Sequence, residues 1–187
     1  SVNNAIHSLN PQILVAGCGT GQHAIMTSTR FLNSKVIAID LSYNSLSYAL
    51  RKTKELGLNN ISYMQADINN LSNLNKNFDV IESVGVLHHM DDPVTGLNNL
   101  VNLLKKDGLM KIGLYSKLGR QRLENAKKFI NKQNVKDHVK FRHSLYLKQN
   151  KIFNDLIDHD EFYSSSQLKD LLFHPKEYAY TIPEIKK

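Results

Sequence analysis

The stretch that decides the fold is "ILVAGCGTGQHAI", residues 13–25. Four apolar residues run into three glycines at alternate positions, Gly17, Gly19 and Gly21, and the residues that follow suit a helix. A glycine-rich turn lets the backbone bend sharply and approach a ligand, and the N–H groups at a helix start favour a negative group. The stretch therefore predicts a strand, a ligand-binding turn and a helix.

The spacing of these glycines separates three kinds of ligand. A triphosphate loop needs G-x-x-x-x-G-K-[ST], and no lysine follows Gly21. The dinucleotide fingerprint G-x-G-x-x-G needs glycine at position 22, which is Gln22. The pattern present is G-x-G-x-G, which serves a carboxylate as well as a phosphate, and it also occurs in turns that exist only for packing.

Short apolar runs alternate with helical patterns up to residue 116. The runs read like strands that are buried on both faces of a parallel sheet, and they cover 12–16, 35–40, 61–68, 78–87 and 109–115. Helices are predicted at 21–32, 44–56 and 93–106, with a short one at 69–76. Asn44 and Asp92 are the expected N-caps, and Gly57 and Gly108 the expected stops. The predicted fold is α/β, a doubly wound parallel sheet of five strands.

Two acids follow the next two strands. Asp40 closes the second strand, 23 residues after Gly17, where a carboxylate can accept hydrogen bonds from two ribose hydroxyls. Asp67 closes the third strand, where a carboxylate can accept from an exocyclic amine. Ligands of open α/β sheets bind at the carboxyl ends of the strands. For either acid alone, a helix N-cap is the alternative explanation.

Residues 11–116 resemble the class I S-adenosylmethionine (SAM)-dependent methyltransferases, which have a Rossmann-like fold. The resemblance rests on "VAGCGTG", "IDLS", "QADI", "FDVIESVGVLHHMDDP" and "LLKKDGLMKIGLY", in this order, and the "VLHHMDDP" stretch is similar to the quinone-biosynthesis-like branch. It implies SAM as cofactor and S-adenosylhomocysteine as product. No metal is expected, because no Cys/His spacing resembles a zinc site. The implied cofactor residues are Gly17, Cys18, Gly19 and Gly21 for the methionine part, Asp40 and Leu41 for the ribose, Asp67 and Ile68 for the adenine, with Ser83 and Val84 alongside.

Methyl transfer from a sulfonium needs alignment and exclusion of water more than a catalytic side chain. If the acceptor must lose a proton, His88 and His89 are the leading candidates for the base, because imidazole titrates near neutrality and they follow the fourth strand. Tyr115, after the fifth strand, is a weaker candidate. The alternative is that these residues only pack or cap.

Residues 117–157 have helical spacing and no strand pattern, and we expect helices laid over the edge of the sheet. The tail at 160–185 more loosely resembles a stretch of bacterial methyltransferase domains, and this resemblance implies a substrate-side cap that offers His174 or Tyr178; the alternative is that these residues are structural. Family members complete the sheet with a hairpin of sixth and seventh strands, and no such pair is found after residue 116. Thr181 and Glu184 predict a capping box where the chain stops, so we expect a C-terminal truncation.

Charge and cysteine content limit the classes of partner and the cellular setting that fit this chain. The net charge of +7 comes from residues 105–151, which hold 14 Lys and Arg against 3 Asp and Glu; a solvated face and an acidic or nucleic-acid partner both fit. No "NPPY"-type or "DPPY"-type motif of the amino-methylating nucleic-acid enzymes is present, which favours a small-molecule or protein acceptor. Cys18 is the only cysteine, which fits a reducing, cytoplasmic setting, and no run is long and apolar enough for a membrane span.

The sequence thus predicts a SAM-dependent methyltransferase with an unidentified acceptor, built from a SAM-binding domain at 1–116 and a cap at 117–187. A different class remains open, which is a non-catalytic SAM- or nucleoside-binding module of a larger protein. The unfinished sheet suggests this alternative. The sequence does not determine the oligomeric state.

Overall fold

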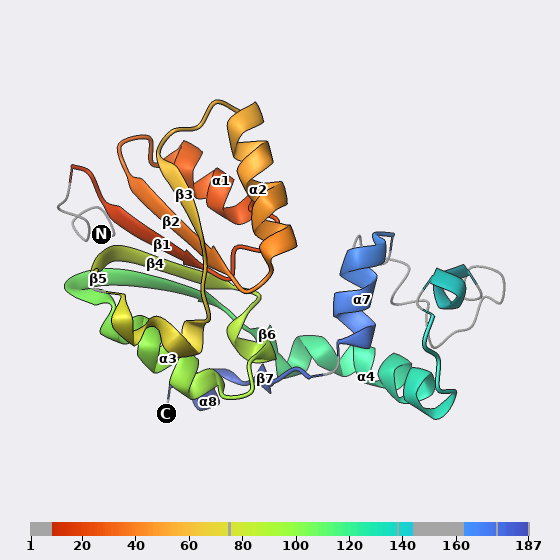
Figure 1. Ribbon diagram of the computed structural model, residues 1–187. Helices are drawn as coiled ribbons and strands as arrows, with labels where there is room; N and C mark the ends of the chain where they lie inside the picture. The colour runs from red at the N-terminus through yellow and green to blue at the C-terminus, as the bar shows by residue number, and fades with distance from the viewer. Residues whose placement is uncertain (1–8, 75, 138, 144–162, 175, 187) are drawn as a thin grey trace. The chain divides into compact units, whose positions relative to one another are not determined.

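The computed structural model describes residues 9–74, 76–137, 139–143, 163–174 and 176–186 (Figure 1). The chain divides into two compact units between Leu114 and Tyr115. The predicted domain boundary lies two residues later, at 116. Among the described residues, no helix is both long and apolar enough to cross a membrane.

The first unit is built on a parallel sheet of five strands, as predicted, and the order of the strands is β3-β2-β1-β4-β5. The strand order changes direction beside β1, which pairs with both β2 and β4, and this is the position where ligands of doubly wound sheets bind. The strands are β1 (Gln12–Ala16), β2 (Lys35–Asp40), β3 (Ile61–Gln65), β4 (Phe78–Val84) and β5 (Leu104–Gly113).

Helices cover the two faces of this sheet (Figure 1). One face packs against α1 (Gln22–Arg30) and α2 (Tyr43–Glu55), and the other against η2 (Ile68–Asn73) and α3 (Pro93–Asn102). A short turn of 3-10 helix, η3 (Leu87–His89), precedes α3.

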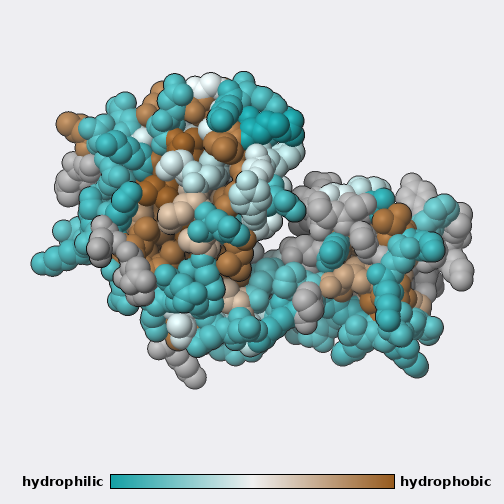
Figure 2. Space-filling model, viewed as in Figure 1, coloured by the Kyte–Doolittle hydropathy of each residue, from teal (hydrophilic) through white to brown (hydrophobic). Residues whose placement is uncertain are grey.

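Alternation along the strands explains why their sequences are almost continuously apolar. In β1, Ile13 and Val15 belong to the core under α1 and α2, whereas Leu14 and Ala16 belong to the core under α3. Because successive side chains point to opposite faces, both faces need apolar residues. Figure 2 shows apolar side chains over the sheet of this unit and polar side chains over its helices.

Tertiary contacts move several predicted boundaries. The helix predicted at 93–106 ends at Asn102, because the N–H of Phe78 donates to the Leu103 carbonyl at 2.9 Å and Leu104 pairs with Phe78 at the start of β5. The stretch "KKDG" is therefore part of β5 rather than a helix end. The strands predicted at 61–68 and 78–87 end earlier, at Gln65 and Val84.

The N-cap of α2 is Ser42 rather than Asn44. The Ser42 hydroxyl accepts from the N–H of Ser45 at 3.2 Å, so the N-cap lies two residues earlier than predicted. The N-cap predicted at Asp92 is confirmed, since its carboxylate accepts from the N–H groups of Val94 and Thr95.

The second unit has a helical core of its own. Its elements are β6 (Tyr115–Ser116), α4 (Lys117–Lys132), α7 (Ser165–Phe173), β7 (Ala179–Tyr180) and α8 (Ile182–Ile185). The core is apolar and consists of Leu123, Ala126, Ile130, Phe141, Leu168, Leu171 and Leu172.

In the second unit, one strand was not predicted and one helix start was. The strand β7 pairs in parallel with β6 over two residues, in a sheet separate from the five-stranded one. The Glu184 carboxylate accepts from the N–H of Thr181 at 2.8 Å and from its hydroxyl at 2.9 Å, as expected for the start of α8. The segment 144–162, predicted to be helical, lies outside the described residues.

Candidate functional site

The glycine loop joins β1 to α1 and folds against the end of β2. The N–H groups of Gly17 and Cys18 both donate to the Ile39 carbonyl, at 2.8 and 2.9 Å. The N–H of Gly21 then donates back to the Cys18 carbonyl at 2.9 Å, which closes the turn. Two strand ends and one helix start therefore meet at this loop.

The two outer glycines are required by their surroundings. All three have a positive φ, of 77° at Gly17, 53° at Gly19 and 87° at Gly21. A Cβ at Gly17 would lie 2.2 Å from a methyl group of Val86, and one at Gly21 would lie 2.5 Å from the Cβ of Ala49. By contrast, no described atom lies within 4 Å of a Cβ built at Gly19. The loop is held at both ends and is open at its middle.

Asp40 has a role that the sequence did not reveal, because it anchors the middle of the glycine loop. One carboxylate oxygen accepts from the N–H of Gly19 at 2.7 Å, and the other accepts from the N–H of Ser42 at 2.8 Å. Each carboxylate oxygen can accept more than one hydrogen bond. The group can therefore hold the loop and still bind hydroxyl donors, while neighbouring Leu41 exposes 66% of its surface.

Cys18 lies inside the loop and is buried. Burial raises the pKa of its thiol to about 12, and the Asp40 carboxylate adds to the shift. Such a thiol stays protonated at neutral pH and is a poor nucleophile. Its part in the site is therefore steric.

Asp67 lies beyond the end of β3 and caps η2, where its carboxylate accepts from the N–H of Asn69 at 2.9 Å. The following residue, Ile68, is buried, and its carbonyl accepts from the side-chain amide of Asn99 at 3.0 Å. Asp67 is thus a helix cap, and the cap uses one of its two carboxylate oxygens. It leaves the second carboxylate oxygen without a capping bond among the described residues.

The end of β4 adds the next part of the site. Ser83 is fully buried, and among the described residues its hydroxyl has no hydrogen-bond partner. Val84 exposes 42% of its surface, and Val86 packs against Gly17 as described above. An unpaired buried hydroxyl beside the open loop fits a site that a polar ligand completes.

The two candidate bases have different environments. In η3, His88 is 1% exposed and His89 is partly exposed, and their rings meet edge to face with centroids 4.3 Å apart. Asp92, which follows closely, serves as the cap of α3, and the hydrogen bond from the Thr95 hydroxyl lowers the pKa of its carboxyl. Asp92 is therefore already bound within the helix start.

The structure assigns the third candidate, Tyr115, to the second unit. The Arg120 guanidinium lies over its ring, 3.4 Å from the centroid, an arrangement typical of a cation–π contact. In the same unit, Nδ1 of His174 lies 2.5 Å from the Lys176 carbonyl, and the Lys176 ammonium lies 5.7 Å from the Tyr178 ring centroid. These contacts fix local packing.

Sequence reasoning missed a buried polar cluster beneath α1. Glu82 on β4 is 4% exposed and contacts His23 and Thr27 of α1. A signal was present, because an acidic residue interrupts the apolar run of β4 and His23 and Thr27 share one face of α1 at a spacing of four. Among the described residues, no group of three or more His, Cys, Asp and Glu side chains could hold a metal.

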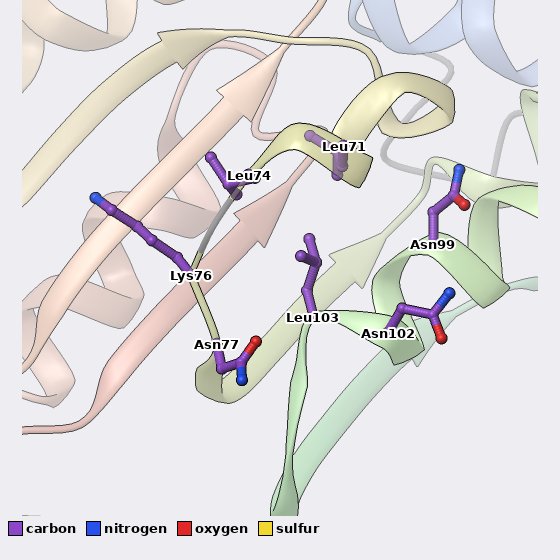
Figure 3. Close-up of a pocket in the computed structure, with 7 residues that line it drawn as sticks. All are labelled: Leu71, Leu74, Lys76, Asn77, Asn99, Asn102 and Leu103. Atoms are coloured by element: carbon purple, nitrogen blue, oxygen red, sulfur yellow. The ribbon is translucent and has the colours of Figure 1, made fainter.

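A pocket of about 410 Å³ lies elsewhere, between η2 and α3 (Figure 3). Four of its lining residues, Lys76, Asn77, Asn102 and Leu103, directly precede β4 or β5. They therefore mark the amino ends of these strands, whereas the glycine loop follows the carboxyl end of β1. None of the predicted cofactor residues lines this pocket.

Comparisons with known proteins agree with this geometry. The family described as "Methyltransferase domain" matches residues 13–108, about half of the chain. A ubiquinone biosynthesis O-methyltransferase from Rickettsia felis is 29% identical over 177 residues, which cover 91% of this chain and 68% of that protein. An uncharacterized protein from a Synechococcus species is 33% identical over 121 residues, which cover 64% of this chain and 29% of that protein.

Solved structures show the same fold. PKMT2 from Rickettsia typhi in complex with AdoHcy has a TM-score of 0.73 and 18% identity, covering 95% of this chain and 37% of that chain. The chain spans about a third of the length of the first curated relatives that it matches. From the glycine loop, the acids at the next two strand ends and the family match, we conclude that the chain belongs to the methyltransferase-domain family, the class I methyltransferases that use SAM.

Proposed function

We propose that the protein transfers a methyl group from SAM to an acceptor by in-line displacement. The observation that carries the proposal is the bond from the Gly19 N–H to the Asp40 carboxylate, because it joins the glycine loop to the acid at the end of β2. This bond places a backbone turn suited to an amino-acid group beside a carboxylate suited to a ribose. It unites the two halves of a nucleoside–amino-acid site.

The residues present fit such a cofactor. Gly17, Gly19 and Gly21 would hold the methionine part, Asp40 with Leu41 the ribose, and Asp67 with Ile68 the adenine; Ser83 and Val84 would lie alongside. When bound, SAM supplies a methyl group on a positively charged sulfur. The protein would align the acceptor and exclude water, which can contribute about 7–11 kcal/mol in well-oriented reactions.

Where the acceptor must lose a proton, His89 is the better placed of the two histidines. His89 is partly exposed, although its Nε2 is buried, whereas His88 is 1% exposed and the two rings meet edge to face. We propose Tyr115 as an acceptor-side residue, and the Arg120 guanidinium lies over its ring.

The charges of the described residues favour a small-molecule or protein acceptor over nucleic acid. Several basic residues of segment 105–151 already pair with carboxylates: Lys105 with Asp79, Lys111 with Glu82, Lys117 with Glu184, Arg120 and Lys127 with Glu177, Lys128 with Glu124, and Lys140 with Asp137. Paired cations contribute less to phosphate binding. A cytoplasmic location is proposed from the single, buried, free cysteine.

Calorimetry with SAM and S-adenosylhomocysteine tests the proposal. We expect both to bind, and Asp40→Ala to weaken binding at least about tenfold, since a hydrogen bond to a charged group is worth about 1.5–3 kcal/mol. Asp79→Ala is the matched control, because the Asp79 carboxylate accepts from the N–H of Gln12 at 2.8 Å near the amino ends of the strands. The affinity of the Asp79→Ala variant for both ligands should stay unchanged.

Two outcomes would contradict parts of this proposal. No binding of either ligand at millimolar concentration would overturn it. Binding without turnover on a broad panel of acceptors would instead favour the non-catalytic SAM-binding module. Salt-sensitive retention on RNA or DNA would contradict the choice of acceptor class.

A further inference from the structure

A buried carboxylate links α1 to β4. One oxygen of Glu82 accepts from the Thr27 hydroxyl at 2.5 Å and lies 3.1 Å from Nε2 of His23, and the other lies 3.8 Å from the Lys111 ammonium. Its side chain is almost fully buried, whereas His23 and Lys111 are partly exposed. Burying a carboxylate is costly unless it is paired and hydrogen-bonded. The contacts with α1 offset that cost.

The last turn of helix α1 is held by the Asn60 amide, which donates to the Ser28 carbonyl at 3.0 Å, so the contact with Glu82 matters for the start of the helix. Its buried residues are Ala24, Thr27 and Ser28, so its buried face carries no large apolar side chain. Its N-cap is Gly21, which has no side chain that could cap the helix start. The hydrogen bond that Thr27 in the second turn donates to Glu82, with His23 of the first turn beside the same carboxylate, therefore holds the beginning of the helix against the sheet.

The start of α1 is also where the glycine loop ends. The first N–H groups of a helix have no partner within the helix and attract anions. In the proposed function, these groups face the methionine part of the cofactor, which carries a carboxylate. A shift of α1 would move them away from it, but would leave Asp40 and Asp67, which lie at the ends of β2 and β3, in place.

We infer that Glu82 is a positioning residue, which acts through Thr27 and His23 to aim the start of α1 at the carboxylate of the cofactor's amino-acid part. This inference rests on the proposed function. It assigns the buried cluster to binding of the amino-acid part and not to the adenosine part. Neither Glu82 nor Thr27 needs to touch the cofactor.

Two ligands separate positioning from general stability. S-adenosylhomocysteine carries the amino-acid part, and methylthioadenosine has the adenosine part without it. We expect Thr27→Val, which keeps the side-chain shape but removes the hydroxyl, to raise the Kd of S-adenosylhomocysteine about tenfold, or about 1.4 kcal/mol. The Kd of methylthioadenosine should change less than about twofold. Glu82→Leu, which removes the accepting oxygens, should show the same selectivity.

Ser28→Ala is the matched control. Ser28 is the next residue of α1 and is fully buried, but its hydroxyl donates to the Ile25 carbonyl of its own helix at 3.2 Å. We expect this variant to leave both Kd values unchanged. The double variant Thr27→Val with Glu82→Leu should lose no more affinity than the weaker-binding single variant, because both substitutions remove the same bond.

The outcomes are distinct from those that test the proposed function. If the unmodified protein binds neither ligand, the proposed function fails. If it binds both, and the Thr27 and Glu82 variants weaken both equally or weaken neither, the positioning role is overturned while the proposed function stands. Melting temperatures of the ligand-free variants, measured in parallel, confirm that each is folded at the temperature of the titration.

Discussion

Replacing Gly17 with alanine tests whether the contact with Val86 shapes the glycine loop. The backbone of Gly17 has φ 77°, and a left-handed conformation costs a residue with a Cβ about 1–2 kcal/mol. The added Cβ would also lie 2.2 and 2.7 Å from the two methyl groups of Val86, and overpacking of this kind costs about 1–3 kcal/mol. We therefore expect Gly17→Ala to lower the free energy of unfolding by about 2–5 kcal/mol.

Gly19→Ala separates the cost of the left-handed backbone from the cost of overpacking. Its φ of 53° carries the same conformational cost, but a Cβ there would meet no described atom within 4 Å. The expected loss is about 1–2 kcal/mol. Adding Val86→Ala to Gly17→Ala should recover most of the overpacking part, because it removes the two methyl groups that lie closest.

Urea unfolding followed by circular dichroism measures these differences. Comparing the midpoints at a constant slope m gives the change in stability for each variant. Equal losses for Gly17→Ala and Gly19→Ala would refute the reasoning, as would simple additivity of Gly17→Ala and Val86→Ala. Either result would mean that Val86 does not restrict the loop.

Two further predictions concern titratable groups. Burial opposes ionisation of Asp79, but hydrogen bonds from the Gln12 N–H and the Lys105 ammonium outweigh it, so the pKa of its carboxyl is lowered. The stabilisation is present above the unfolded pKa of about 3.9 and is lost as the pH falls through the folded pKa. Asp79→Asn should therefore reduce the pH dependence of the free energy of unfolding below about pH 4. An unchanged pH dependence in this range would contradict the prediction. Because the pKa of Cys18 is about 12, iodoacetamide at pH near 8 should modify it far more slowly in the folded protein than in urea, and equal rates would show that the thiol is exposed.

Local patterns predicted the elements well, but not their ends. The apolar runs of β1 and β2 match the structure at both boundaries, because a strand buried on both faces needs an apolar residue at nearly every position. The end of α3 could not be predicted, because the Leu103 carbonyl is bonded to Phe78, which lies 25 residues earlier in the chain. Similarly, Ser42 rather than Asn44 caps α2, next to the bond that Asp40 makes to the Ser42 N–H.

The glycine spacing, with Asp40 and Asp67 after the next two strands, was sufficient to indicate a SAM-type site. These signals are local, because a positive φ demands glycine and the carboxyl ends of parallel strands share one edge. Only the tertiary structure showed that Asp40 holds the Gly19 N–H and that Glu82 holds α1. Glu82 and Thr27 are 55 residues apart. No local pattern records which buried donor will face a buried carboxylate, because packing of the helix on the sheet decides it.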